Sequence, residues 1–116
     1  MEGPTIKTVH KADRRAAEKP VPLESAIVRS ILRYLNGLPE CRARKVAGSE
    51  KRAGEPDIDC VCKGRALKLE VKRPEPFGRK PTTLQAETMA AWHRAGAVTG
   101  VVRSLDDVKE LLAGIG

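Results

Sequence analysis

The spacing of apolar residues predicts an amphipathic helix close to the start of the folded region. Apolar side chains recur every three or four residues at Leu23, Ile27, Ile31, Leu35 and Leu38. This period places them on one face of a helix, which is typical of a helix packed against a core. Pro22 suits the beginning of this helix, and Asn36-Gly37 with Pro39 ends it. Residues 1–20 show no period, so we expect a flexible arm there and a folded domain over 21–116.

Two short alternating runs, 57–62 and 66–72, predict a β-hairpin. Lys63-Gly64 between them suits a two-residue turn. Such a turn sets the register: Cys62 faces Arg65, and Asp57 faces Glu70 at the far end. A more polar strand is expected before the hairpin, over 41–47.

The C-terminal part of the chain predicts a helix, a strand and a second helix. Thr82 with Gln85 is a capping-box pattern that begins a helix running to about Ala95. Residues 97–102 are almost wholly apolar, which is typical of a parallel strand buried on both faces. A last helix follows Ser104 and runs through Leu112. The expected order is α-β-β-β-α-β-α, an α/β fold with a mixed sheet flanked by helices. The helix that begins at Thr82 is expected to bury four side chains: Leu84, Ala91, Trp92 and Ala95.

Composition narrows the class of protein. A length of 116 residues with 41% hydrophobic residues fits one core. No apolar run approaches the roughly 20 residues that span a bilayer, and no secretory signal is evident, so no membrane partner is expected. The three cysteines are an odd number, which argues against a disulfide framework and for a reducing compartment such as the cytoplasm. We expect all three to be small buried side chains: Cys41, Cys60 and Cys62.

The charge pattern points to a polyanionic partner. The chain has 22 Lys and Arg against 15 Asp and Glu, a net charge of +7. More than half of the cations fall in 40–54 and 63–81, on either side of Glu55, Asp57 and Asp59. Acidic residues in such surroundings indicate either a salt-bridged face or an anionic metal site within a phosphate-attracting surface.

The predicted register favours the metal site. Facing side chains in an antiparallel pair have Cβ atoms about 5 Å apart, so Asp57 and Glu70 repel each other unless a cation lies between them. Lys72 lies on the same face, two residues beyond Glu70. The alternative is a lysine–carboxylate pair on a solvated face. Asp59 is expected to form a cross-strand ion pair with Lys68.

The ordered motifs Pro56-Asp57, Glu70-Val71-Lys72 and Gln85 resemble the PD-(D/E)XK nuclease superfamily. More narrowly, residues 23–112 resemble the virus-type replication-repair nuclease (VRR-NUC) family. Gly54 before the first motif and Lys72-Arg73-Pro74 after the second belong to the same likeness. The resemblance implies a restriction-endonuclease-like core.

The resemblance also implies an active site with Mg²⁺ or Mn²⁺ as cofactor. Asp57 and Glu70 match the acidic metal ligands, and the carbonyl of Val71 is a further ligand. Lys72 matches the lysine that orients or deprotonates the attacking water. Gln85 matches the helix glutamine near the metal, and Glu24 matches the acidic residue that completes the site. Histidine and cysteine ligands are absent from this set, so zinc is not expected.

The implied function is a metal-dependent DNA endonuclease (a deoxyribonuclease) that hydrolyses phosphodiester bonds. Stand-alone members of the family resemble Holliday-junction resolvases, which implies a homodimer on branched DNA and a phage-type DNA-repair role in bacterial cytoplasm. Two alternatives remain: flap, nicking or exonuclease activity with little structure preference, and a non-catalytic DNA-binding module. Phe77 is expected either to stack on a base or to pack. The expected DNA contacts are Arg44, Lys45, Lys51, Arg52, Arg73, Phe77, Arg79 and Lys80.

Overall fold

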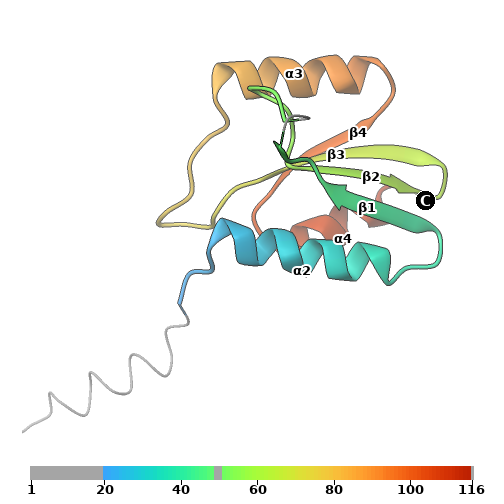
Figure 1. The fold of residues 1–116 in the computed structure, drawn as a ribbon, viewed down its shortest axis with the longest axis horizontal. Coiled ribbons are helices and arrows are strands. Elements are labelled where there is room, and N and C mark those ends of the chain that lie inside the picture. The colour runs from blue at the N-terminus through green and yellow to red at the C-terminus, as the bar shows by residue number, and fades with distance from the viewer. Residues whose placement is uncertain (1–19, 49–50, 116) are drawn as a thin grey trace, which may run out of the picture.

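A four-stranded sheet separates α3 from α2 and α4 in the computed structural model, which describes residues 20–48 and 51–115 (Figure 1). The expected N-terminal arm, 1–20, lies outside these residues except for its last position. Among the described residues, no helix is both long and apolar enough to cross a membrane. The elements are α2 (Glu24–Asn36), β1 (Cys41–Lys45), β2 (Ile58–Cys62), β3 (Arg65–Val71), α3 (Thr83–Arg94), β4 (Val98–Val102) and α4 (Leu105–Ala113).

The sheet is mixed, as predicted, with the strand order β1-β2-β3-β4. The first three strands are antiparallel, and β4 pairs parallel with β3. The predicted order of elements is confirmed. The predicted bounds of the two hairpin strands and of the helix that begins at Thr82 differ from those of β2, β3 and α3 by no more than two residues. The polar first strand ends at Lys45 rather than at residue 47.

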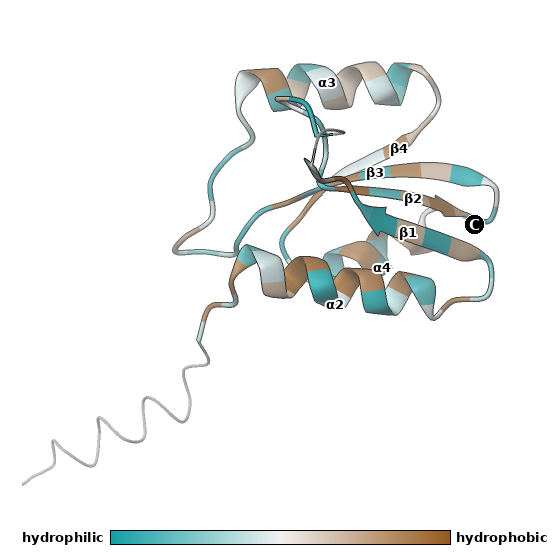
Figure 2. Ribbon diagram, in the orientation of Figure 1, coloured by the Kyte–Doolittle hydropathy of each residue, from teal (hydrophilic) through white to brown (hydrophobic). Residues whose placement is uncertain are grey.

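The core lies between the sheet and the pair α2 and α4. The side chains of α2 that face the sheet are Ile27, Val28, Ile31 and Leu35. Figure 2 shows α2 as alternating hydrophobic and hydrophilic bands, the pattern of an amphipathic helix. Leu23 immediately precedes the helix and is 61% exposed, so it does not join the core stripe. The sheet contributes the alternating side chains Ile58, Cys60, Cys62, Leu67, Leu69 and Val71.

The hairpin of β2 and β3 has the register that its turn predicts. Cys62 pairs with Arg65, and Ile58 pairs with Leu69. Lys63 and Gly64 both have positive φ angles, 53° and 78°, as a tight two-residue hairpin turn requires. The turn thus delivers the start of β2 to the end of β3, where the paired acidic residues lie.

The expected burial around α3 and β4 is wrong. β4 is parallel to β3 but is an edge strand, so Val101 is 39% exposed. Along α3 only Met89 is buried, Trp92 is half-buried, and the other three residues expected in the core are exposed: Leu84, Ala91 and Ala95. The reason is that α3 covers the polar face of the hairpin, where the Nζ atom of Lys68 lies 2.9 Å from Oδ1 of Asp59. That predicted cross-strand ion pair is confirmed.

The cysteine prediction is correct for the burial of Cys60 and Cys62, but Cys41 is only partly buried and a disulfide is present. Cys41 and Cys62 form a disulfide that joins β1 to β2, whereas Cys60 is free and buried as expected. The pair forms because the register of β1 places Cys41 directly opposite Cys62. An odd cysteine count says nothing about such a pair, since one bridge and one free thiol also make three.

Candidate active site

Asp57 is fixed at the point where the chain enters β2. Its backbone carbonyl accepts a hydrogen bond from the N–H of Val46 at 2.9 Å. Its side-chain Oδ2 accepts a hydrogen bond from the N–H of Val71 at 2.8 Å. The carboxylate is therefore bound to the backbone of β3, next to Glu70 in the chain. Buried Pro56 precedes it and keeps the approach to the strand rigid.

Glu70 is a buried carboxylate, 3% exposed, with an asymmetric set of partners. Its Oε2 accepts a hydrogen bond from Nε2 of Gln85 at 2.9 Å and lies 3.3 Å from Nζ of Lys72. Its Oε1 is also buried but has no hydrogen-bond partner among the described residues. Burial raises the pKa of Glu70, the charge of Asp57 raises it further, and Lys72 and Lys51 oppose the rise. A buried acceptor of this kind is costly unless a cation or proton binds it.

Gln85 reaches Glu70 because the start of α3 holds its side chain. The hydroxyl of Thr82 accepts from the N–H of Gln85 at 3.1 Å, and Oε1 of Gln85 accepts from the N–H of Thr82 at 2.9 Å. This confirms the predicted capping box. With Oε1 engaged in the cap, Nε2 of the same amide is directed at Glu70. One side chain therefore begins the helix and orients the buried carboxylate.

Lys51 occupies a position that the sequence did not predict. Its Nζ lies 3.0 Å from Oδ1 of Asp57 and 2.8 Å from the carbonyl of Glu55. The sequence places Lys51 among the expected DNA contacts, and in the structure its ammonium also neutralises one of the two paired acids. Gly54, with a φ of +87°, lets this segment lie against α3, because a Cβ there would be 2.7 Å from Cγ of Leu84.

Glu24 lines the same cavity as Lys72. The cavity has a volume of about 390 Å³ and lies between the start of α2 and the loop that follows β3. No hydrogen bond or ion pair joins Glu24 to Asp57 or Glu70 within the described residues, so the structure brings it to the site's edge rather than into the carboxylate pair. The full lining is Glu24, Lys72, Arg73, Pro76, Phe77, Gly78 and Arg79.

Two solved structures share this arrangement of elements. The first, described as a "VRR_NUC domain", is 26% identical with a TM-score of 0.64, over 78% of this chain and 94% of its own. The second, a "VRR_NUC domain protein", is 15% identical with a TM-score of 0.65, over 83% of this chain and 89% of its own. Over most of its length, this chain matches VRR_NUC domain proteins in structure. No protein-family model and no curated protein matches the sequence.

The VRR_NUC match agrees with the resemblance found in the motifs and implies a nuclease. The motif residues meet at one end of the sheet: Asp57 at the start of β2, Glu70 and Lys72 at the end of β3, and Gln85 at the start of α3. The metal-binding or catalytic role of each of these residues stays a prediction. The structure shows that the chain brings them together.

The other predicted DNA contacts are of two kinds: side chains that interact with other parts of the protein, and side chains that are exposed. Arg73 donates to the carbonyls of Pro22 at 3.0 Å and Val21 at 3.2 Å, so it anchors the chain ahead of α2. Arg44 lies 3.8 Å from Asp59 and is 63% exposed. The remaining cations are exposed at the surface of the VRR_NUC fold: Lys45, Arg52, Arg79 and Lys80.

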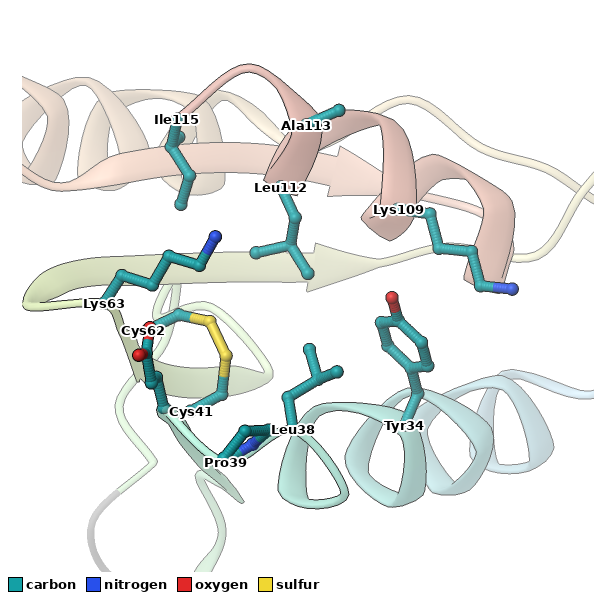
Figure 3. A pocket seen from close by; sticks show the side chains of 11 residues that line it. Tyr34, Leu38, Pro39, Cys41, Cys62, Lys63, Lys109, Leu112, Ala113 and Ile115 are labelled. Carbon is teal, nitrogen blue, oxygen red and sulfur yellow. A yellow bond between two sulfur atoms is a disulfide. The ribbon is translucent and has the colours of Figure 1, made fainter.

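A second cavity, of about 380 Å³, lies at the opposite end of the sheet (Figure 3). Tyr34, Leu38 and Leu112 project into it from α2, the following turn and α4, and the Cys41–Cys62 disulfide forms one wall. Its lining contains neither of the paired acids. The first cavity is lined by neither acid either, but it does include Lys72, whose Nζ lies 3.3 Å from Oε2 of Glu70.

The donor set fits a hard divalent cation. Within the described residues, no group of three or more His, Cys, Asp or Glu side chains is placed to hold a metal. Mg²⁺, however, keeps several of its waters and binds proteins through one or two carboxylates. Asp57 and Glu70 supply two, and the partnerless Oε1 of Glu70 is a buried oxygen ready to bind a cation.

Proposed function

We propose that this VRR_NUC domain, residues 21–116, is a divalent-metal-dependent DNA endonuclease that hydrolyses phosphodiester bonds. The observation that carries the proposal is the environment of Glu70. One of its oxygens is held by Gln85 and Lys72, and the other is buried without a hydrogen-bond partner in the described part of the chain. A purely structural ion pair leaves no such oxygen, whereas a cation-binding carboxylate needs one.

Asp57, Glu70 and the carbonyl of Val71 would hold Mg²⁺ or Mn²⁺, with Glu24 available from the neighbouring helix. Such an ion, when bound, polarises a phosphoryl oxygen and lowers the pKa of a water. The chain arranges its ligands in advance: Asp57 is held by the N–H of Val71, and Glu70 by Nε2 of Gln85. Ordered ligands of this kind reduce the reorganisation that binding and reaction require.

Lys72 is the residue we assign to the reacting phosphate. Its ammonium is paired with Glu70 but retains 15% of its side-chain exposure and lines the cavity that reaches the surface. From there it can orient a water and stabilise the negative charge that develops on the phosphoryl oxygens. Glu70 holds the ammonium in place through Oε2, so the same carboxylate links the metal ligand set to the lysine.

Branched DNA is the substrate we propose, with a homodimer as the active form. The net charge of +7 and the exposed cations beside the cavity suit a polyanion. Twofold symmetry would present two cavities to two strands of a junction. Light scattering on the purified protein checks the oligomer: a mass of twice 12.6 kDa supports the dimer, and 12.6 kDa excludes it.

The function is tested by cleavage of four labelled DNAs with Mg²⁺ or Mn²⁺: a four-way junction, a flap, a single strand and a duplex. We expect the junction to be cut fastest, and we expect Asp57→Asn to cut none of them. Exposed Lys63, at the distant hairpin turn, supplies the matched control Lys63→Ala, which should cut as the wild type does. Equal cutting of all four substrates rejects the junction preference. If neither the wild type nor Lys63→Ala cuts any of them, the nuclease function is rejected.

A further inference from the structure

We infer that the cavity beside Lys72 binds an unpaired nucleobase next to the cleaved phosphate, stacked on the ring of Phe77. This inference rests on the proposed function and specifies its substrate: branched DNA with a nucleotide that is unpaired at the branch point, next to the cut. Phe77 belongs to the loop between β3 and α3, only five residues beyond Lys72. It lines the cavity together with Lys72 and Arg79.

The ring of Phe77 is exposed and rests on the side chain of Arg73 instead of packing into the core. It is 54% exposed, whereas the chain's other two aromatic residues, Tyr34 and Trp92, are half-buried. The guanidinium of Arg73 lies 4.3 Å from the ring centroid, a cation–π contact that covers part of the ring. Arg73 is itself fixed by the carbonyls of Val21 and Pro22. A ring so supported and still more than half exposed offers a surface for stacking.

Arg103 holds the loop that carries Phe77 at both of its ends. Its guanidinium donates to the carbonyl of Arg73 through Nη1 and to the carbonyl of Arg79 through Nη2, each at 2.9 Å. Gly78 makes this contact possible, because a Cβ there would lie 2.7 Å from Nη1 of Arg103. The ring is therefore positioned before DNA arrives, which lowers the entropic cost of binding a base.

The size and lining of the cavity suit one nucleotide. Its 390 Å³ gives room for a base and an adjoining phosphate. The side chains of Lys72 and Arg79 supply positive charge for phosphate oxygens. A base in a duplex is stacked between its neighbours and exposes only its edges, so a ring can stack on it only when it is unpaired. The selectivity that follows is for single-stranded nucleotides.

The competing explanation is that Phe77 only packs on Arg73 and keeps the loop in place. The two differ in what removal of the ring does: binding of a single strand weakens if the ring stacks on a base, and single-strand and duplex binding change alike if the ring only packs. Phe77→Tyr keeps both the ring and the cation–π contact, so it preserves base stacking. Phe77→Ala removes the ring while Arg103 still anchors both ends of the loop. Val61→Ala is the matched control, since Val61 is 53% exposed on β2 and does not line the cavity.

The test measures DNA binding in EDTA, where no cleavage occurs, with oligonucleotides that carry 2-aminopurine. We expect the wild type to quench the probe in a single strand but not in a fully paired duplex. Phe77→Ala should weaken single-strand binding by about 5- to 150-fold, the usual loss for one base stacked on an aromatic ring. Phe77→Tyr and Val61→Ala should bind as the wild type does, and duplex binding should be unchanged throughout.

Either of two results overturns the inference: single-strand binding by Phe77→Ala that equals that of the wild type, or an equal loss on single strand and duplex. A thermal melt of each variant identifies misfolding, and Phe77→Leu, which keeps an apolar side chain but has no ring, tests the stacking if Phe77→Ala does not fold. Cleavage with Mg²⁺ is scored separately on the wild type. A nuclease without base stacking rejects only this subsite, and base stacking without cleavage rejects only the hydrolytic function.

Discussion

Nζ of Lys51 lies 3.0 Å from Oδ1 of Asp57, while the other oxygen of the same carboxylate accepts the N–H of Val71 at 2.8 Å. Asp57 therefore has a counterion that the chain itself supplies. A divalent cation that binds Oδ1 must share this carboxylate with the lysine or displace it. Lys51 thus links the loop before β2 to the metal affinity of the proposed site.

Lys51→Met should bind Mn²⁺ more tightly than the wild type, because Asp57 no longer has a competing ammonium. In EDTA the variant should also lose about 1 kcal/mol of stability, the scale of one partly exposed ion pair. Isothermal calorimetry gives the affinity, and chemical denaturation gives the stability. Lys63→Met changes an exposed lysine at the hairpin turn and serves as control. Equal Mn²⁺ affinities in both variants would contradict competition at Asp57.

Glu70→Gln tests the buried carboxylate through its pH dependence. The pKa of Glu70 is raised above 4.5 in the folded state, so between 4.5 and that raised value the folded protein holds more protons than the unfolded chain. Stability in EDTA should therefore fall as the pH rises through this window. The Glu70→Gln variant has no carboxyl group to ionise at this position, so its stability should not fall through this window. It should therefore be the more stable protein at pH 7.

The control for this pH series is Glu110→Gln, which changes an exposed glutamate on α4. Its unfolding free energy should follow that of the wild type at every pH. Thermal or urea unfolding from pH 4 to 8 provides the comparison. Parallel curves for Glu70→Gln and the wild type would show that burial of this carboxylate costs nothing.

Gln85→Ala and Thr82→Ala separate helix capping from the second role of Gln85. Each removes part of the capping box and should cost about 1 kcal/mol of stability. Only Gln85→Ala also removes the hydrogen bond to Glu70. We expect it to weaken Mn²⁺ binding by about 10-fold, the usual size of an effect from a residue that orients a metal ligand. Equal Mn²⁺ affinities in the two variants would limit Gln85 to capping.

Lys72→Ala should reduce the cleavage rate by about 100- to 1,000-fold, as expected when a preorganised electrostatic group is removed. DNA binding in EDTA should change little, because many other cations contribute to it. Rapid-quench kinetics and fluorescence anisotropy measure the two quantities. A variant that cleaves at the wild-type rate would show that Lys72 only balances the charge of Glu70.

The sequence predicts the centre of the site because local geometry determines it. A two-residue turn allows one register, and that register places Asp57 and Glu70 at the same end of the hairpin. The capping box likewise places Gln85 at the first turn of α3 without any knowledge of tertiary structure. These features depend on residues that are close in the chain or joined by one tight turn.

Features that depend on longer connections were not predictable in this way. The loop before β2 has no period, so nothing in the sequence shows that Lys51 returns to Asp57 rather than facing DNA. The register of β1, and with it the Cys41–Cys62 disulfide, depends on how the strand docks after a turn without a pattern. The apolar run of β4 was equally uninformative about its place at the sheet edge.

The hydrogen bonds of Arg103 to both ends of the loop between β3 and α3 have a practical consequence for redesigning that loop. Its two contacts are to backbone carbonyls, at Arg73 and Arg79, so of the positions between them only Gly78, where a Cβ would meet Nη1 of Arg103, has to be kept. The segment around Phe77 is therefore an exchangeable cassette. Libraries randomised at its tip should alter which nucleic acids are chosen while leaving the hydrolytic machinery intact.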